Sequence, residues 1–361
     1  MASVNDYLQH LVEVGGSDIH LKAGGPAFVR VDGDLRPVTH LEPLSANDTR
    51  RYALEMMDER SRSRFEEQET EVDFAYSVQG LGRFRVNAFT QRGSVGIVCR
   101  RVLPGNQEFD ELGLPPAVRK LSEEHRGLLL VTGPTGSGKT TTTAAMIGHI
   151  NATRRCHIVT VEDPIEIMHR DDHAIVDQRE IGVDTEDFSS ALRSVSRQDP
   201  DVIFIGEMRD LETVAAALQA AETGHLVIST LHTTDARETV NRIVDMFPKE
   251  QQNQARLSLA NSLKGIVCQR LVPRATGEGR VAVVEVLVMT ARIYDFILDP
   301  AELYRIEDAI AEGGYYGMQT FDQHLLQLYA EDEITLRDAM AAATNPHDLK
   351  VALRSAGLAT A

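Results

Sequence analysis

The stretch LLLVTGPTGSGKT at residues 128–140 decides how this chain folds. It begins as a short apolar strand, turns through glycines and continues into a helix predicted from Thr141 to Ile150. Gly133, four further residues and then Gly138-Lys139-Thr140 fit the P-loop spacing G-x-x-x-x-G-K-[ST]. A glycine-rich turn between a strand and a helix can also bind nothing. Here every fixed position is filled in the context that the motif requires, which favours a phosphate-binding loop.

Each residue type in this loop has a physical reason. Glycines adopt backbone conformations that other residues avoid, so N–H groups can turn inward around phosphate oxygens. The positive end of the following helix dipole points at the same anion. Lys139 is placed to reach the β- and γ-phosphates of ATP, and the Thr140 hydroxyl to ligate Mg²⁺. The candidate nucleotide-binding residues here are Gly133, Pro134, Thr135, Gly136, Ser137, Gly138, Lys139, Thr140 and Thr141.

Length and charge set limits on the class of protein. At 361 residues the chain is too long for one compact module, so two domains are expected. The net charge of −17 argues against a broad electrostatic surface for nucleic acid or for an anionic membrane, although a local basic patch is compatible with it. No signal peptide and no apolar run of transmembrane length is present. We therefore expect a cytoplasmic protein without membrane insertion.

Cysteine and histidine spacing predicts no structural metal site. The three cysteines are far apart in the sequence and form no C-x-x-C pair, so neither a zinc ribbon nor a disulfide framework is indicated. The pairs His169 with His173 and His225 with His232 lack the further ligands that would complete a metal site.

Residues 1–102 predict a small α+β domain. A helix is expected over 4–14, and Ser45 with Asp48 resembles a capping box that opens a second helix. The turn of a hairpin is expected at Asp32-Gly33. The charge-dense segment 58–71 fits a solvated helix and linker. Strands are expected over 17–21, 28–31, 34–38, 72–76, 83–89 and 95–102.

The rest of the chain predicts a linker followed by an α/β core. Residues 103–118 are rich in proline and glycine, which is typical of an interdomain hinge with a short docking segment. From 119 to 361 apolar strands alternate with helices, as in a parallel sheet covered on both faces, and from about 290 the pattern is mostly helical. Within the core we expect strands over 158–162, 202–205 and 226–230, and helices over 188–197 and 211–223.

Polar groups follow several of these strands at the point where each ends. Glu162, Asp163 and Glu166 lie at the end of the strand over 158–162. Glu207 comes after the strand over 202–205, and His232 after the strand over 226–230. Ligands of open α/β sheets lie beyond the carboxyl ends of the strands, so these groups are expected near the P-loop. An ATPase needs one carboxylate on the metal side and another to activate water.

Glu207 fits the metal-side carboxylate and Glu166 is a candidate base. A carboxylate after a strand can also be a helix cap, which leaves a second interpretation open for each. His232 and His225 fit either a sensor of the γ-phosphate, a contact to a neighbouring subunit, or ordinary polar histidines.

Four ordered motifs resemble those of the secretion and pilus motor ATPases, and the resemblance extends over nearly the whole chain. Two shorter elements, at 17–21 and 317–322 (GMQTFD), are similar to family elements as well. The motifs are Walker A at 133–140, the Asp box IVTVEDPIE at 158–166, Walker B DPDVIFIGEMRD at 199–210 and the His box TGHLVISTLHTT at 223–234.

The resemblance implies a RecA-like ATPase core with a smaller, PAS-like N-terminal domain. It implies a homohexamer that binds ATP and Mg²⁺ between the N-terminal domain of one subunit and the core of another. By matching positions, Glu166 is the catalytic acid, Glu207 the Walker B acid and His232 the His-box residue. Arg85 and Arg100 lie on N-terminal strands that match a segment approaching the nucleotide, so both are candidate γ-phosphate partners.

Within the family the chain is most similar to the type IV pilus retraction motors, which are short and lack a four-cysteine zinc motif. That similarity implies a peripheral position at the inner face of the cytoplasmic membrane, an inner-membrane platform protein as partner, and a paralogous pilus motor as a second one. One stretch departs from the pattern. Where retraction motors often carry an AIRNLIRE-like segment, residues 290–298 read TARIYDFIL and keep only its apolar spacing.

Several functions therefore stay open at this point. The chain fits a main retraction motor, an accessory retraction paralogue or the motor of a divergent pilus. A motor for type II secretion, pilus assembly or conjugation shares the core, as does a nucleic-acid translocase, although the acidic balance speaks against the latter. A non-hydrolysing regulatory module is disfavoured by the presence of both Glu166 and Glu207.

Overall fold

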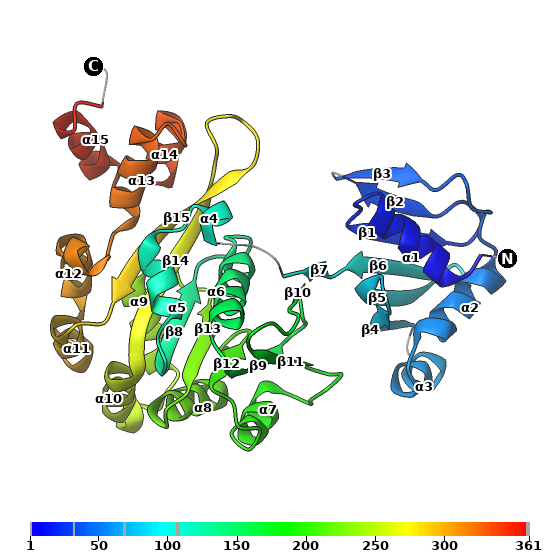
Figure 1. Cartoon of the computed structure of the whole chain (residues 1–361), viewed down its shortest axis with the longest axis horizontal. Helices are drawn as coiled ribbons and strands as arrows, with labels where there is room; N and C mark the ends of the chain where they lie inside the picture. The colour runs from blue at the N-terminus through cyan, green and yellow to red at the C-terminus, as the bar shows by residue number, and fades with distance from the viewer. Residues whose placement is uncertain (1, 32, 68–69, 106–108, 359–361) are drawn as a thin grey trace. The chain divides into compact units, whose positions relative to one another are not determined.

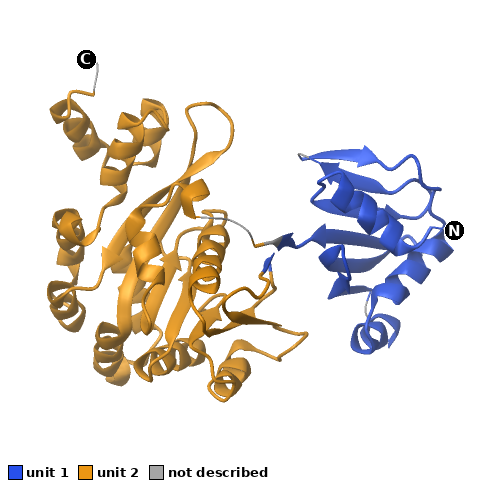
Figure 2. Ribbon diagram, viewed as in Figure 1, with its two compact units in different colours: residues 1–104, 166–168 blue, residues 105–165, 169–361 orange. Residues whose placement is uncertain are grey.

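The structure is a computed structural model that describes residues 2–31, 33–67, 70–105 and 109–358 (Figure 1). The chain forms two compact units, one of residues 1–104 with 166–168 and the other of residues 105–165 with 169–361 (Figure 2). The prediction of an α/β core with a smaller N-terminal α+β part is confirmed. The described part of the chain contains no helix long and apolar enough to cross a membrane.

The N-terminal unit is a six-stranded antiparallel sheet with helices on one face. Its strand order is β3-β2-β1-β6-β5-β4. The strands are β1 (Asp18–Lys22), β2 (Phe28–Val31), β3 (Asp34–Pro37), β4 (Glu71–Val78), β5 (Gly82–Gln91) and β6 (Ser94–Arg101). The helices are α1 (Val4–Glu13), α2 (Ala46–Met56) and α3 (Glu59–Glu67).

Alternation along the strands decides which face of this sheet is covered. In β5, Phe84, Val86 and Ala88 are buried in the same hydrophobic cluster as the apolar faces of α1 and α2. The intervening side chains point to the opposite face, because successive residues of a strand alternate. The predicted capping box is confirmed, since Ser45 and Asp48 bond reciprocally at the start of α2. Gly33 has a φ of 90°, as the hairpin turn requires, while its predicted companion Asp32 lies outside the described residues.

The second unit is built on a seven-stranded mixed sheet in the order β11-β9-β12-β13-β8-β14-β15. All neighbouring pairs are parallel except β14 with β15, which form an antiparallel pair at one edge. The strands are β8 (Gly127–Thr132), β9 (His157–Glu162), β11 (Ile175–Glu180), β12 (Val202–Ile205), β13 (Leu226–Leu231), β14 (Leu263–Pro273) and β15 (Arg280–Val288).

Helices cover both faces of this sheet (Figure 1). Leu129 and Val131 of β8 belong to a cluster with α4, α5 and α6, whereas Leu128 and Leu130 belong to a larger cluster with the other helices. The first group comprises α4 (Phe109–Leu112), α5 (Pro116–Ser122) and α6 (Lys139–Thr153). The second comprises α7 (Phe188–Val195), α8 (Leu211–Glu222), α9 (Ala236–Asp245), α10 (Gln252–Ser262), α11 (Ala291–Leu298), α12 (Ile306–Glu312), α13 (Phe321–Ala330), α14 (Leu336–Ala342) and α15 (Pro346–Ser355).

Some elements were not predicted from the sequence. Strand β11 has a polar sequence because it lies at the edge of the sheet, where most of its residues are only partly covered. Strand β14 contains Lys264, Gln269 and Arg270, which break its apolar run. Its partner β15 and the helices α9 and α10 were likewise unassigned.

The predicted linker over 103–118 contains regular structure. Strand β7 (Leu103–Pro104) pairs in parallel with β10 (Ile167–Met168). Farther on, Phe109 of α4 and Val118 of α5 are buried in the core of the second unit. Residues 106–108 of the linker lie outside the described residues.

Candidate active site

The phosphate loop has the conformation that its glycines were expected to supply. Gly133, Gly136 and Gly138 have φ values of 145°, 78° and 90°, a region that L side chains rarely adopt. At Gly133 a Cβ atom would also collide with the backbone carbonyl of Gln269. Both backbone conformation and space therefore require glycine at this position.

Lys139 closes over the loop at the first residue of α6. Its Nζ donates hydrogen bonds to the carbonyl oxygens of Gly133, at 2.7 Å, and of Pro134, at 3.1 Å. Of the other predicted nucleotide-binding residues, Pro134, Thr135 and Thr140 are exposed around the loop, whereas Ser137 is buried. The arrangement places a cation among backbone groups suited to phosphate oxygens.

The strands that carry the motifs end side by side, as the sequence predicted. β9, β12, β13 and β8 are neighbours in the sheet and run in parallel. Leu231 at the end of β13 pairs with Thr132 at the end of β8, and Ile205 at the end of β12 pairs with Val161 of β9. The residues that follow these strands are therefore brought to one edge.

A row of charged side chains crosses this edge. Nζ of Lys139 lies 3.4 Å from Nδ1 of His232, and Nε2 of the same ring lies 3.1 Å from a carboxylate oxygen of Glu207. Arg209 contacts the second oxygen of Glu207 at 2.8 Å. When the neutral ring carries its proton on Nε2, it donates to Glu207 and accepts from Lys139 through Nδ1. The row links Walker A, the His box and Walker B.

Glu207 is held in its charged form. Burial acts to raise its pKa, but the hydrogen bond from Arg209 and the electrostatic interactions with His232 and Arg209 outweigh that effect, so the pKa of Glu207 falls below its usual value. The same ion pair raises the pKa of Arg209. Arg209 was not singled out from the sequence, because a basic residue after a Walker B strand carries no distinctive spacing.

The Asp box separates into two environments. Glu162 is buried at the end of β9, where it accepts hydrogen bonds from Thr160 at 2.6 Å and from Gln178 at 3.0 Å. Glu166 is exposed and directly precedes β10, the short strand that pairs with β7. Glu162 is thus part of a buried polar network, while Glu166 is accessible to solvent.

Three further predicted residues, His225, Arg85 and Arg100, are not part of this row. His225 precedes β13 at the opposite end of that strand from His232, and its Nδ1 lies 3.0 Å from the carbonyl of Ala220 in α8. This contact agrees with a structural role. In the N-terminal unit, Arg85 and Arg100 are directly opposite each other on β5 and β6. Arg100 donates from Nε to the buried carboxylate of Asp18 at 2.7 Å.

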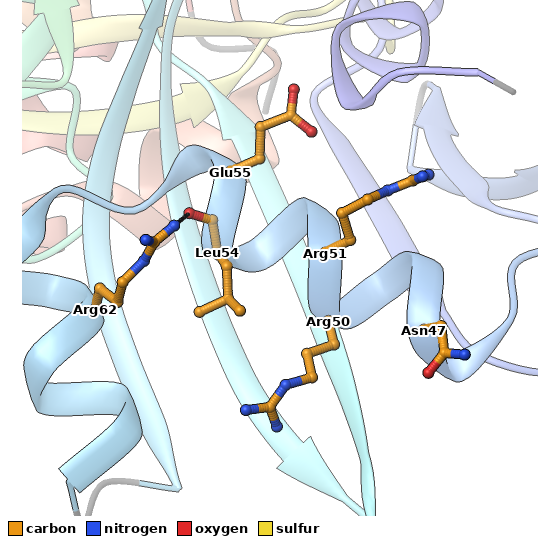
Figure 3. Close-up of a pocket in the computed structure, with 6 residues that line it drawn as sticks. All are labelled: Asn47, Arg50, Arg51, Leu54, Glu55 and Arg62. Carbon is orange, nitrogen blue, oxygen red and sulfur yellow. Dashed lines mark hydrogen bonds between the residues drawn. The ribbon is translucent and has the colours of Figure 1, made fainter.

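A shallow pocket of about 470 Å³ lies on α2 and α3 of the N-terminal unit (Figure 3). Arg62 reaches across it to the carbonyl oxygen of Leu54 at 2.6 Å. The pocket carries none of the motif residues; its lining is Asn47, Arg50, Arg51, Leu54, Glu55 and Arg62.

Among the described residues no group of three or more histidine, cysteine or acidic side chains is arranged to hold a metal ion.

Comparison with known proteins shows the family of the chain. Residues 1–287 match the family described as "Type II/IV secretion system protein". The chain is 44% identical to the type IV pilus retraction ATPase PilT of Pseudomonas aeruginosa over 347 residues, covering 96% of this chain and 99% of that one. It is equally 44% identical over 347 residues to the type IV pilus ATPase PilU of the same organism, covering 96% of this chain and 90% of PilU.

Solved structures show the same fold. The crystal structure of the pilus retraction motor PilT with bound ADP superposes with a TM-score of 0.88 at 46% identity, over 97% of this chain and all of that one. The ATPase DotB of Legionella pneumophila superposes with a TM-score of 0.74 at 28% identity, over 94% of this chain and 95% of DotB. The chain belongs to the type II/IV secretion system protein family and is a P-loop ATP hydrolase.

Proposed function

We propose that this protein is a hexameric, Mg²⁺-dependent ATPase that powers retraction of type IV pili by driving their disassembly. The observation that carries the proposal is the row Lys139–His232–Glu207 beside the phosphate loop, in a chain 44% identical to PilT and to PilU over 96% of its length. The row supplies the cation and the carboxylate that phosphoryl transfer to water needs.

Each motif residue has a proposed part in hydrolysis. Lys139 binds the β- and γ-phosphates and leaves its two carbonyl partners in order to do so. Glu166, exposed before β10, acts as the catalytic acid–base residue of the Asp box toward the attacking water. His232 links the P-loop lysine to Glu207, so that it responds to the γ-phosphate.

The site fits a magnesium ion. Mg²⁺ prefers oxygen ligands and keeps several waters, and a hydroxyl at the start of α6 with a nearby carboxylate is the usual protein contribution. Thr140 is exposed in the first turn of α6, and Glu207 is kept ionised by Arg209 and His232. These two residues would hold the ion, directly or through water. When bound, it would neutralise charge on the phosphate oxygens.

We further propose that the active site is completed between subunits. In this scheme 1–102 form a mobile N-terminal domain and 119–361 the ATPase core with a helical C-terminal region. The linker over 103–118 bends ahead of α4 and α5, whose Phe109 and Val118 are docked in the core. Arg85 and Arg100 of one subunit contact the γ-phosphate bound to the next, and hydrolysis rotates the N-terminal domain about the hinge. That motion acts on an inner-membrane platform protein, which places the motor at the cytoplasmic face of that membrane.

The test combines enzymology with a genetic readout. Purified protein should release phosphate from ATP only with Mg²⁺, with specific activity that rises with protein concentration as rings assemble. Deletion of the gene in its host should leave cells with surface pili that do not retract and without twitching motility. Intact motility together with a loss of protein secretion or DNA transfer would instead assign the motor to secretion or conjugation.

A second candidate is an accessory retraction motor, because the identity to PilU equals the identity to PilT. It is favoured too by α11 (Ala291–Leu298), which buries Ile293, Phe296 and Ile297 but lacks the AIRNLIRE-like sequence on its exposed face. An accessory motor would need its paralogue, so the deciding comparison is complementation of host strains that lack one or both motors. Nucleic acid is not an expected partner, and DNA-stimulated hydrolysis would contradict this proposal.

A further inference from the structure

Gln269 is a buried polar residue outside the four motifs. It follows Cys268 on β14, and Cys268 pairs with Thr132 at the end of β8. The position next to Gln269 is therefore occupied by Gly133, the first glycine of the phosphate loop. The side chain is only 2% exposed. Glutamine is seldom so deeply buried, and a buried amide without partners costs free energy.

The contacts of Gln269 reach both ends of the phosphate loop. Its Oε1 accepts a hydrogen bond of 2.7 Å from Thr142 Oγ1 in the first turn of α6, and Thr142 is 1% exposed. Its backbone carbonyl lies against Gly133, and its Nε2 would be 2.7 Å from a Cβ atom added at Gly138. One residue of a separate strand thus touches the start of the loop, its end and the helix that follows.

We propose that Gln269 is a positioning residue that holds the phosphate loop in its nucleotide-binding conformation. The inference rests on the proposed nucleotide site and adds to it a residue that never needs to touch the nucleotide. Glycines at three positions give the loop many accessible conformations, and ordering such a segment costs conformational entropy. Contacts with Gln269 at both ends of the loop restrict it before ATP binds, so less conformational entropy is lost on binding.

A merely space-filling role for Gln269 fits the contacts less well. Leu271, two residues along the same face of β14, also packs beside Gly138, which shows that an apolar side chain is accommodated there. Gln269 has a polar side chain where an apolar one could pack, and that side chain accepts a hydrogen bond from α6. The bond fixes the helix that begins at Lys139, and with it the lysine that binds phosphate.

Three substitutions and one control separate positioning from packing. Gln269→Leu keeps the size of the side chain and removes the amide. Thr142→Val removes the hydroxyl from the other side of the same hydrogen bond, and Thr142→Ser restores it. Gln319→Leu is the control, because Gln319 is a partly buried glutamine whose Nε2 donates, at 3.1 Å, to the backbone carbonyl of Val284, the residue of β15 that pairs with Gln269. Its hydrogen bond therefore lies in the same pair of strands but does not reach α6.

The measurements are ADP affinity, with a fluorescent analogue, and the kcat and KM for ATP, all on the full chain. Losing one buried hydrogen bond should weaken ADP binding and raise KM by about tenfold in Gln269→Leu and in Thr142→Val. The change in kcat should be smaller, because loop order affects ground-state and transition-state binding alike. The variant that combines Gln269→Leu with Thr142→Val should bind ADP no more weakly than either single variant, since both substitutions remove the same hydrogen bond.

Thermal unfolding with and without ADP completes the test. Without ligand, Gln269→Leu and Gln319→Leu should lower the unfolding temperature by similar amounts. ADP should raise the unfolding temperature of Gln319→Leu as it does that of the wild type, and that of Gln269→Leu much less. Wild-type ADP affinity in Thr142→Val, or equal weakening in Gln319→Leu, would overturn the inference even if Gln269→Leu failed to fold. A wild-type chain that binds no ADP would overturn the nucleotide site itself, and this inference with it.

Discussion

His232 is hydrogen-bonded to Glu207, with 3.1 Å between Nε2 and the carboxylate oxygen. The two residues come from neighbouring strands, β13 and β12, and only the sheet brings them together. Because Nδ1 of the same ring faces Lys139, a change at the phosphate loop reaches Glu207 through one imidazole.

The first prediction concerns this pair. We expect Glu207→Gln to lower kcat by ~10²–10⁴-fold, because the carboxylate that would face the metal ion loses its charge. His232→Ala should lower kcat as well, with ADP affinity changed by less than about threefold, since the ring acts between catalytic groups. Steady-state phosphate release and ADP titration measure both effects. Unchanged turnover in both variants would contradict the role of the row.

The second prediction concerns Lys139. Lys139→Ala should abolish measurable hydrolysis, because the loop loses the cation that binds the β- and γ-phosphates. The fold should survive, since the lysine is only partly buried and lies on the surface of the loop, where its Nζ contacts two backbone carbonyls and the ring of His232. Circular dichroism and thermal unfolding check the second point. Turnover at the wild-type rate would disprove the P-loop assignment.

The third prediction concerns Glu166. Glu166→Gln should remove turnover, because the proposed acid–base residue loses its carboxylate. Nucleotide binding and folding should be retained, because an exposed side chain contributes little to stability. Glu162→Gln is the informative contrast. Glu162→Gln disturbs a buried hydrogen-bond network and should lower the unfolding temperature more than Glu166→Gln does. Both variants should be compared over a protein concentration series that spans ring assembly.

The fourth prediction concerns the paired arginines of the N-terminal unit. Arg85→Ala and Arg100→Ala should each lower kcat by up to ~10³-fold if these side chains meet the γ-phosphate of a neighbouring subunit. Lys22→Ala, an exposed cation on β1 of the same sheet, serves as the control for general charge loss. Equal effects in all three variants would point to overall charge instead of a specific contact.

Glu285 supplies the fifth prediction, on pH dependence. This carboxylate of β15 is buried and accepts the backbone N–H of Ala236 at the start of α9, 2.9 Å away. Burial raises its pKa to about 7, against the effect of that hydrogen bond, and the charges of Asp235 and Glu307 add to the rise.

The sign of the effect follows from the raised pKa. Folding favours the protonated acid, so this contribution to stability is fully present below the pKa of the unfolded state, near 4.5, and is lost as pH rises to about 7. The loss is on the order of 3 kcal/mol at most. Glu285→Gln should flatten the decline between pH 5 and 8, and the exposed Glu278→Gln should not. Urea unfolding at several pH values measures it.

The sequence allowed the positions of the motif residues to be predicted because they belong to short local motifs. The P-loop spacing, the apolar strands and the residues directly after them are all local signals, and parallel strands then bring the strand ends to one edge. Glu207 and His232 were predicted near the loop on that ground alone. Their direct contact confirms the argument from strand ends.

The surroundings of other candidate residues depend on contacts that no local pattern encodes. Arg100 finds Asp18 because β6 pairs with β1, a register set by the whole N-terminal sheet. Gln269 lies in a strand whose polar residues obscure its apolar period, and its importance becomes visible only when β14 is placed beside β8. The polar edge strand β11 was missed for a similar reason.

The position of β14 has a consequence for how the protein is made. On the ribosome, Walker A, the Asp box, Walker B and the His box all emerge before this strand is synthesised. Yet β14 lies between β8 and β15 in the finished sheet, and non-local pairings of this kind form late. A nascent chain that ends after β13 therefore carries every nucleotide motif and still lacks the strand against which the phosphate loop rests.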